Sequence, residues 1–388
     1  MLGNFIYHNP TKIYFGVDAL ANLKEEITGK YQRVLLAYGG GSIKRNGIYD
    51  LVINVLRKCK VEIVEFAGIM PNPTYEKVLE GAKLVREKQI DLILAVGGGS
   101  TIDCAKAVSL ASYHDDAWNR FWVKHEPISQ KLIPIASILT MAGTGSEMNG
   151  GTVITNTEAM LKKGTGYIEL NPQFSILNPE FTYSVPKYQM LSGIFDIMSH
   201  IMETYFSADD GDNLSDDLAE AILKNVMRNT KVAIEDPYNY VARSNIMWDA
   251  TMALNGTLDP GKDGDWEVHA IEHQIGAYYD VAHGMGLAAV SIAYYRQKIP
   301  FAVARFKKFA INVFNVDPDK KTDLAVANEG IDALADFIKK SEMCSSLREL
   351  GISDESKLKA IASSVSCYPT SYQTLTTDDV YKILKESF

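Results

Sequence analysis

Short apolar runs alternate with amphipathic stretches along the first half of the chain. Four runs rich in Val, Ile and Leu predict buried strands, at residues 33–38, 61–66, 91–96 and 133–138. Between them, apolar residues recur every three or four positions and predict helices at 43–58, 75–88 and 101–112. Alternation of strands and helices is typical of a parallel sheet covered on both faces. We therefore expect a Rossmann-like domain with a parallel sheet over residues 1–185.

The pattern changes near residue 186. Beyond it, strand-like runs almost disappear, and helical periodicity dominates at 187–206, 214–234, 240–255 and onward to the C-terminus. The sequence contains no internal repeat, low-complexity tract or flexible linker. We predict an all-helical domain over residues 186–388, so the expected fold class is α/β plus all-α.

Composition narrows the functional classes. The chain has 388 residues, which suits two domains, and its net charge of −9 disfavours a nucleic-acid partner. No apolar stretch is long enough to cross a bilayer, and the N-terminus lacks the pattern of a signal peptide. The four cysteines lie far apart, which is typical of free thiols in a reducing compartment. These features predict a cytoplasmic enzyme with no membrane partner.

Glycine-rich segments follow three of the predicted strands. Two of them share the motif GGGS, and a third reads GTGSE within residues 140–147. Glycines let the backbone turn sharply, and the N–H groups of a following helix can bind a pyrophosphate. One GGGS alone more often marks a tight turn, but two copies between strand and helix favour dinucleotide binding. The two motifs comprise Gly39, Gly40, Gly41 and Ser42, and Gly97, Gly98, Gly99 and Ser100.

Four of the seven histidines fall into two short segments of the helical half. His200 follows Asp196 by four residues, and His273 follows His269 by four, so each pair lies on one face of a helix. His283 follows after a break in the helical pattern. One carboxylate with two or three imidazoles suits Zn²⁺ or Fe²⁺. A lone histidine is more often a hydrogen-bonded core residue, but five such polar residues among apolar neighbours favour a metal site.

Several motifs together resemble one family. They are PNP at 71–73, GGGSTIDCAK, GTGSE, the two pairs spaced by four residues, and the final HG at 283–284. The chain resembles the iron-containing (group III) alcohol dehydrogenases over essentially its whole length, and most closely their NADPH-dependent butanol dehydrogenase and aldehyde reductase branch. The resemblance implies a metal-dependent NAD(P)H oxidoreductase that interconverts small primary alcohols and aldehydes. It also implies a homodimer and the architecture shared with dehydroquinate synthase.

The resemblance assigns roles to individual residues. It implies that the metal ligands are Asp196, His200, His269 and His283, and that His273 faces cofactor and substrate as a catalytic residue. Glu272 departs from the family pattern, because relatives often carry a small residue there. Met141 is a second departure. The implied cofactor-binding residues outside the two GGGS motifs are Asn72, Asp103, Thr140, Thr144 and Lys162.

The expected chemistry follows from these parts. The metal polarises the substrate oxygen as a Lewis acid, and the nicotinamide carries the hydride. The proton route, either through His273 or through the cofactor ribose and water, stays open, as does the choice between Fe²⁺ and Zn²⁺. We expect NADP(H) to be preferred over NAD(H), because Gly39 stands where NAD-preferring relatives often carry Asp. Lys44 and Arg45 add positive charge nearby.

Two rival functions share this architecture. A dehydroquinate synthase needs a basic cluster for a phosphorylated substrate, and none flanks the histidine motifs. A redox-inactive binding protein is disfavoured because the ligand set is intact. Candidates for the substrate pocket are Trp266, Met141, Asn149 and Phe195.

Overall fold

The computed structural model describes residues 1–388 except 1–3, 208–210, 212 and 368–371. The chain forms two compact units, each built from separate segments. The sheet unit comprises His8–Pro186 and Tyr238–Thr251. The helical unit comprises Met1–Tyr7, Lys187–Pro237 and Met252–Phe388.

A six-stranded sheet, parallel throughout, forms the centre of the sheet unit. Its order is β1-β8-β5-β4-β2-β3, so β4 lies between β5 and β2 and is buried along its whole length. An antiparallel hairpin of β6 and β7 stands apart from the sheet. The strands are β1 (Lys12–Phe15), β2 (Arg33–Tyr38), β3 (Glu62–Phe66), β4 (Leu92–Gly97), β5 (Ile135–Leu139), β6 (Gly151–Asn156), β7 (Leu161–Gly166) and β8 (Phe174–Leu177).

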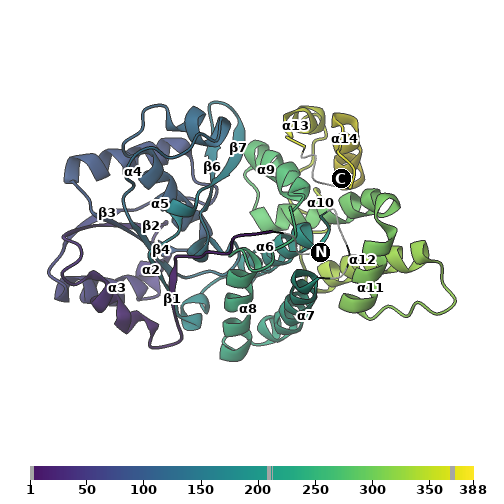
Figure 1. Ribbon diagram of the computed structural model, residues 1–388, viewed down its shortest axis with the longest axis horizontal. Helices are drawn as coiled ribbons and strands as arrows, with labels where there is room; N and C mark the ends of the chain where they lie inside the picture. Colours follow the sequence, from purple (N-terminus) through teal and green to yellow (C-terminus); the bar gives the residue numbers. More distant parts are fainter. Residues whose placement is uncertain (1–3, 208–210, 212, 368–371) are drawn as a thin grey trace. The chain divides into compact units, whose positions relative to one another are not determined.

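Helices cover both faces of the sheet (Figure 1). On β2, Leu35 and Ala37 join the apolar core beneath α4 and α5, whereas Val34 and Leu36 join the core beneath α1 and α3. Successive side chains of a strand point to opposite faces, so the continuous apolar runs of the sequence are explained by burial on both sides. The helices are α1 (Leu23–Ile27), α2 (Ser42–Arg45), α3 (Ile48–Lys58), α4 (Tyr75–Lys88) and α5 (Gly99–Ala111).

The four predicted strands are confirmed, but the single helix expected over 43–58 is wrong. The chain forms two helices there, because Gly47 adopts a left-handed conformation (φ 82°) between them. Four strands were not predicted. The strands β1 and β8 span only four residues each, and β6 and β7 form a separate hairpin. Short 3₁₀ or π turns occupy Ala19–Asn22, Trp118–Val123, Ser146–Met148, Ile168–Leu170, Pro179–Thr182 and Ile299–Phe301.

No strand lies beyond residue 186 among the described residues, as predicted. In the helical unit, α10 packs against both α6 and α9. None of the described helices is long and apolar enough to cross a membrane. The helices after residue 186 are α6 (Lys187–Tyr205), α7 (Leu214–Glu235), α8 (Tyr240–Ala253), α9 (Glu267–Tyr279), α10 (His283–Lys298), α11 (Val303–Phe314), α12 (Asp323–Lys340), α13 (Leu358–Ser364) and α14 (Thr377–Glu386).

Most of α8 belongs to the sheet unit. The guanidinium Nη2 of Arg243 donates to the carbonyl oxygen of Thr182 at 3.0 Å, and the hydroxyl of Thr251 donates to Oε1 of Glu147 at 2.5 Å. Periodicity shows that a segment is helical but not which unit it packs on. A domain boundary at residue 186 therefore does not assign residues 238–251 to the sheet unit.

Candidate functional site

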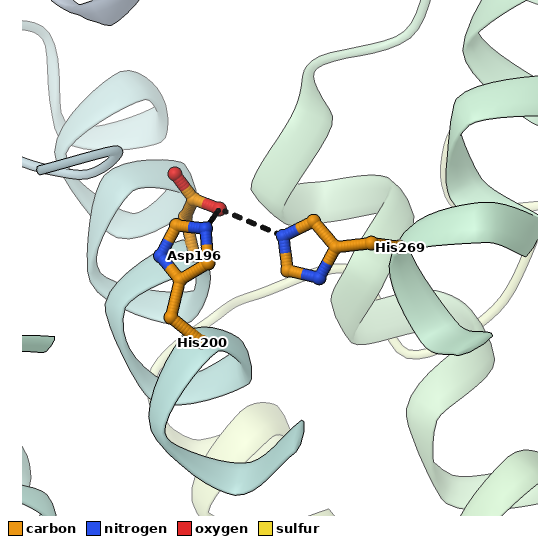
Figure 2. Close-up of side chains that lie close together, drawn as sticks. All are labelled: Asp196, His200 and His269. Atoms are coloured by element: carbon orange, nitrogen blue, oxygen red, sulfur yellow. Dashed lines mark ion pairs between the residues drawn. The ribbon is translucent and has the colours of Figure 1, made fainter. Parts of the chain in front are cut away.

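Three histidines from three helices of the helical unit converge on one carboxylate oxygen. Asp196 and His200 lie one turn apart on α6, His269 lies on α9, and His283 is the first residue of α10. Oδ1 of Asp196 lies 3.5 Å from Nε2 of His200 and 3.6 Å from Nε2 of His269. It lies 3.4 Å from Nε2 of His283. Figure 2 shows Asp196 and His200 on one helix, with His269 pointing toward them from another.

The cluster is buried and electrostatically coupled. Oδ1 of Asp196 and Nε2 of His269 have no hydrogen-bond partner among the described residues. Burial acts to raise the pKa of Asp196, but the imidazoles of His200 and His283 hold it well below its ordinary value. Burial lowers the pKa of His200 to about 4. Asp196 is therefore ionised and His200 neutral, which are the states that ligate metals.

Two further carboxylates lie behind the histidines. Burial acts to lower the pKa of His269, but the carboxylates of Glu203, at Nδ1, and Asp196, near Nε2, raise it to about 10, and a cation bound at Nε2 would displace the proton from that nitrogen. Nδ1 of His283 contacts Oε2 of Glu272 in the same way. Both glutamates are completely buried. Each contact directs the Nε2 atom of its ring toward Asp196, the arrangement by which carboxylates orient metal-binding histidines.

Sequence reasoning missed both glutamates. Glu203 follows Asp196 by seven residues, two helical turns, so it lies on the same face of α6, and this spacing was the available signal. Glu272 was treated as a departure from the family pattern at the pocket. The structure instead places it beneath His283.

Two glycines explain the HGMG sequence at the start of α10. A Cβ atom at Gly284 would lie 1.8 Å from the carbonyl oxygen of Ser192, so α10 approaches the backbone of α6 too closely for any side chain. A Cβ atom at Gly286 would lie 2.8 Å from Cγ of Glu272. The first glycine allows His283 to reach Asp196, and the second leaves room for the glutamate behind it.

His273 lies next to this cluster, one turn after His269 on α9. Its ring centroid is 6.0 Å from that of His269 and 5.5 Å from that of His283. His273 and His283 are half-buried, whereas His200 and His269 are buried. His273 therefore stands on the more accessible side of the cluster.

The glycine loops gather in the sheet unit at the carboxyl ends of neighbouring parallel strands. Gly97 ends β4, and Gly98 and Gly99 begin α5. A Cβ atom at Gly99 would lie 2.3 Å from Oγ1 of Thr144, and one at Gly98 would lie 3.1 Å from Cβ of Met141. The glycines thus allow the loop after β4 to pack against the GTGSE segment. The amide of Thr140 donates to the carbonyl oxygen of Gly97 at 2.9 Å and joins the two loops.

A buried polar network supports these loops. Asp103 accepts hydrogen bonds from Oγ of Ser146 at 2.6 Å and from the amide of Val153 at 2.9 Å. Nζ of Lys106 donates to the same Ser146 hydroxyl at 2.8 Å and to carbonyl oxygens of Asn149 and Gly151. Burial lowers the pKa of Lys106 to about 8. The carboxylate of Asp103 therefore binds the GTGSE segment and β6 within the protein.

The other predicted cofactor residues lie at three places in the sheet unit. Gly39 directly follows β2, and no atom lies within 4 Å of a Cβ atom built at Gly40. Gly41 has a left-handed backbone conformation and precedes Ser42, the first residue of α2. Asn72 is left-handed (φ 51°) and half-buried in the PNP loop, and Lys162 is buried on β7.

Lys44, expected from the sequence to add positive charge beside the first GGGS loop, forms an ion pair with Glu65. Its Nζ atom lies 3.3 Å from Oε2 of Glu65. The same carboxylate accepts hydrogen bonds from the hydroxyls of Tyr38 and, at 2.6 Å, Tyr49.

Comparison with known proteins agrees with these observations. Residues 10–179 match the family model for iron-containing alcohol dehydrogenase. Residues 190–388 match the model for the C-terminal region of the Fe-containing alcohol dehydrogenase family. The chain belongs to the iron-containing alcohol dehydrogenase family.

Similar proteins cover nearly the whole chain. NADH-dependent butanol dehydrogenase A of Clostridium acetobutylicum is 40% identical over 99% of this chain and 100% of its own length. NADPH-dependent aldehyde reductase YqhD of Escherichia coli is 36% identical over 84% of this chain and 85% of its own. The crystal structure of NADH-dependent butanol dehydrogenase A from Thermotoga maritima has a TM-score of 0.94 at 38% identity, covering 99% of this chain and 98% of that one.

These matches confirm the predicted family and fold class. They also confirm the predicted reaction class, an NAD(P)H-dependent oxidoreduction of alcohols and aldehydes. Among the pocket candidates, Phe195 is completely buried. The side-chain oxygen of Asn149 accepts hydrogen bonds from Lys106 and Gly151. The ring of Trp266 lies beside the rings of His200 and His269.

The close approach of α10 to α6 leads to a stability prediction. Gly284→Ala places a methyl group against the Ser192 carbonyl, so we expect the free energy of unfolding to fall by about 3 kcal/mol. The control is Gly40→Ala, because nothing lies within 4 Å of an added Cβ there and the backbone is not left-handed. Urea denaturation measures both variants. Equal losses of stability would contradict the packing argument.

Proposed function

We propose that this protein reduces small aldehydes to primary alcohols, and catalyses the reverse reaction, with a divalent metal held by Asp196, His200, His269 and His283. The observation that carries the metal assignment is the position of one buried carboxylate oxygen 3.4–3.6 Å from three imidazole nitrogens. These separations exceed the usual hydrogen-bond length of about 3 Å. Oδ1 of Asp196 and Nε2 of His269 are therefore buried side by side without a hydrogen bond that would compensate for their burial.

The spacing fits a coordinated ion. Two ligand atoms that each lie about 2.1 Å from a tetrahedrally coordinated metal are about 3.4 Å apart. Three imidazoles and one carboxylate without a thiolate suit Fe²⁺ or Zn²⁺. The ionised state of Asp196 and the neutral state of His200 fit the same role.

The residues of the chain contribute orientation and proton transfer. The bound metal would polarise the substrate oxygen, and the nicotinamide would carry the hydride. Glu203 and Glu272 hold the rings of His269 and His283 at their Nδ1 atoms. His273, half-buried beside both rings, would take up or release the proton of the substrate oxygen at an imidazole nitrogen, a role that its distances to these rings support.

The glycine loops support the cofactor assignment. The loop after β4 precedes a helix N-terminus, where amide groups can bind a pyrophosphate. We also propose that NADP(H) is preferred over NAD(H). The support is the absence of an acidic residue from Tyr38 to Asn46, which leaves no carboxylate in the loop after β2 to repel a 2′-phosphate. Lys44 adds less to this proposal than the sequence indicated, because Glu65 pairs with it. The homodimer and the cytoplasmic location remain predictions.

The metal assignment predicts different outcomes for two neighbouring histidines. His283→Ala removes a ligand, so metal content falls to near zero and aldehyde-dependent oxidation of NADPH or NADH stops. His273→Ala keeps the metal but slows turnover, because the proton route is lost. Metal analysis of anaerobically purified proteins, paired with steady-state kinetics, measures both effects. If His273→Ala loses metal while His283→Ala retains it, the assignment is wrong.

The contacts of Glu203 and Glu272 with the histidines predict that loss of one carboxylate weakens metal binding without abolishing it. Glu203→Gln keeps the size of the side chain but removes the charge that orients His269, so metal affinity should fall about 10- to 100-fold. Titration of the metal-free protein with Zn²⁺ against a competing chelator gives the dissociation constant. The control is Glu220→Gln, a buried glutamate of α7 bound to Tyr205 instead. An unchanged affinity in Glu203→Gln would show that the carboxylate does not support the ligand.

Cofactor choice is tested at Gly39. Gly39→Asp introduces a charge beside the expected 2′-phosphate, so kcat/KM for NADPH should fall at least tenfold more than for NADH. A Cβ atom at this position lies 3.2 Å from the carbonyl oxygen of Ile69, so the substitution also has a steric effect. Gly39→Asn, equal in size but uncharged, separates the two effects. A wild-type preference for NADH, or equal ratios in Asp and Asn variants, would refute the proposal.

A further inference from the structure

Trp266 adopts a backbone conformation that a large side chain rarely takes. It precedes α9 with φ 51° and ψ 18°, in the left-handed region, and its side chain makes no capping hydrogen bond. Such a conformation costs about 1–3 kcal/mol and persists only where the surroundings impose it.

The cause is a buried clamp on the residues that flank Trp266. The hydroxyl of Tyr294 on α10 lies 2.5 Å from Oδ2 of Asp265 and 2.9 Å from Oε2 of Glu267. Nζ of Lys298 lies 2.6 Å from the same Glu267 oxygen. All four clamp residues are buried. Because the two acidic residues turn inward to one tyrosine, the tryptophan between them is held in its left-handed conformation.

The clamp places the indole beside the metal-centre histidines. The centroid of the Trp266 ring lies 5.5 Å from that of His269 and 6.1 Å from that of His200, edge to face with both. Gly264 provides the space behind it, since a Cβ atom there would lie 2.5 Å from Nε1 of Trp266. The side chains of these two histidines are at most 8% exposed, whereas Trp266 is half-buried. The indole is therefore a partly accessible side chain next to two deeply buried histidines.

We propose that Trp266 forms a wall of the substrate pocket at the metal centre and that its bulk disfavours aldehydes branched next to the carbonyl carbon. The inference rests on the proposed function, because the substrate oxygen must approach the ion held by the four ligands. A linear chain presents two hydrogens on its second carbon, whereas a branched one must place a methyl group against the rigid indole. The clamp prevents the wall from moving aside, so Tyr294 is a positioning residue for specificity.

The test compares butanal with 2,2-dimethylpropanal as substrates. Trp266→Ala should raise the ratio of kcat/KM for the branched aldehyde over the linear one by about tenfold or more. Trp266→Phe should raise it less, and metal content should stay at the wild-type level. If wild type reduces aldehydes but the ratio is unchanged in both variants, Trp266 is not a pocket wall. If wild type reduces neither aldehyde, the proposed function fails and the inference fails with it.

A binding measurement makes the test independent of turnover. Trifluoroethanol, an unreactive primary alcohol, should change the tryptophan fluorescence of the metal- and cofactor-loaded protein. This change should disappear in Trp266→Phe but persist in Trp248→Phe, whose tryptophan pairs with Phe15 in the sheet unit. A change that survives in Trp266→Phe would place the ligand away from this indole.

Two neighbouring tyrosines of α10, Tyr294 in the clamp and Tyr295 outside it, allow a matched test of the clamp. Tyr294→Phe removes the hydroxyl that joins Asp265 and Glu267, so the ratio for branched over linear aldehydes should rise severalfold while metal content is retained. Tyr295→Phe is the control, because Tyr295 is equally buried and its hydroxyl has no hydrogen-bond partner in the described part of the chain. Equal ratios in the two variants would show that the clamp does not set the position of the wall.

Discussion

The burial of the Asp196 carboxylate is the constraint on which the helical unit depends. An ionised carboxylate away from water is strongly unfavourable unless positive charge compensates for it. Three imidazoles surround one of its oxygens, but their Nε2 atoms are too distant to form strong hydrogen bonds. A divalent cation at the centre would satisfy the carboxylate and the three nitrogens together, so the proposed metal would also account for the packing of polar groups in an apolar interior.

The surrounding architecture keeps these four atoms in place. Gly284 lets α10 begin against the backbone of α6, which brings His283 to Asp196. Glu203 and Glu272 fix two of the rings from behind, and each comes from a helix that also supplies a ligand. In the sheet unit, by contrast, the predicted cofactor loops depend on close backbone approach and on the buried Lys106 network. On the proposed function, the helical unit would hold the metal and the sheet unit would bind the cofactor.

Local pattern predicted much of this molecule because its main signals are local. The runs of apolar residues in β2 to β5 gave the parallel sheet, and four-residue spacing placed Asp196 with His200 and His269 with His273 on common helix faces. The remaining features depend on contacts between distant segments. The break at Gly47 needs a left-handed residue, the packing of α8 depends on Thr182 and Glu147, and the role of Glu272 appears only once α10 lies against α9. The spacing of residues along the sequence carries no information about such contacts between distant segments.

X-ray absorption spectroscopy of the anaerobically purified protein tests the metal assignment most directly. The technique reports the atoms bound to an iron or zinc ion without requiring catalysis. The account predicts one ion per chain, first-shell nitrogen and oxygen at about 2.0–2.2 Å, and the multiple scattering of three imidazoles. Sulfur in the first shell, fewer than two imidazoles, or a fully active protein without bound metal would contradict it.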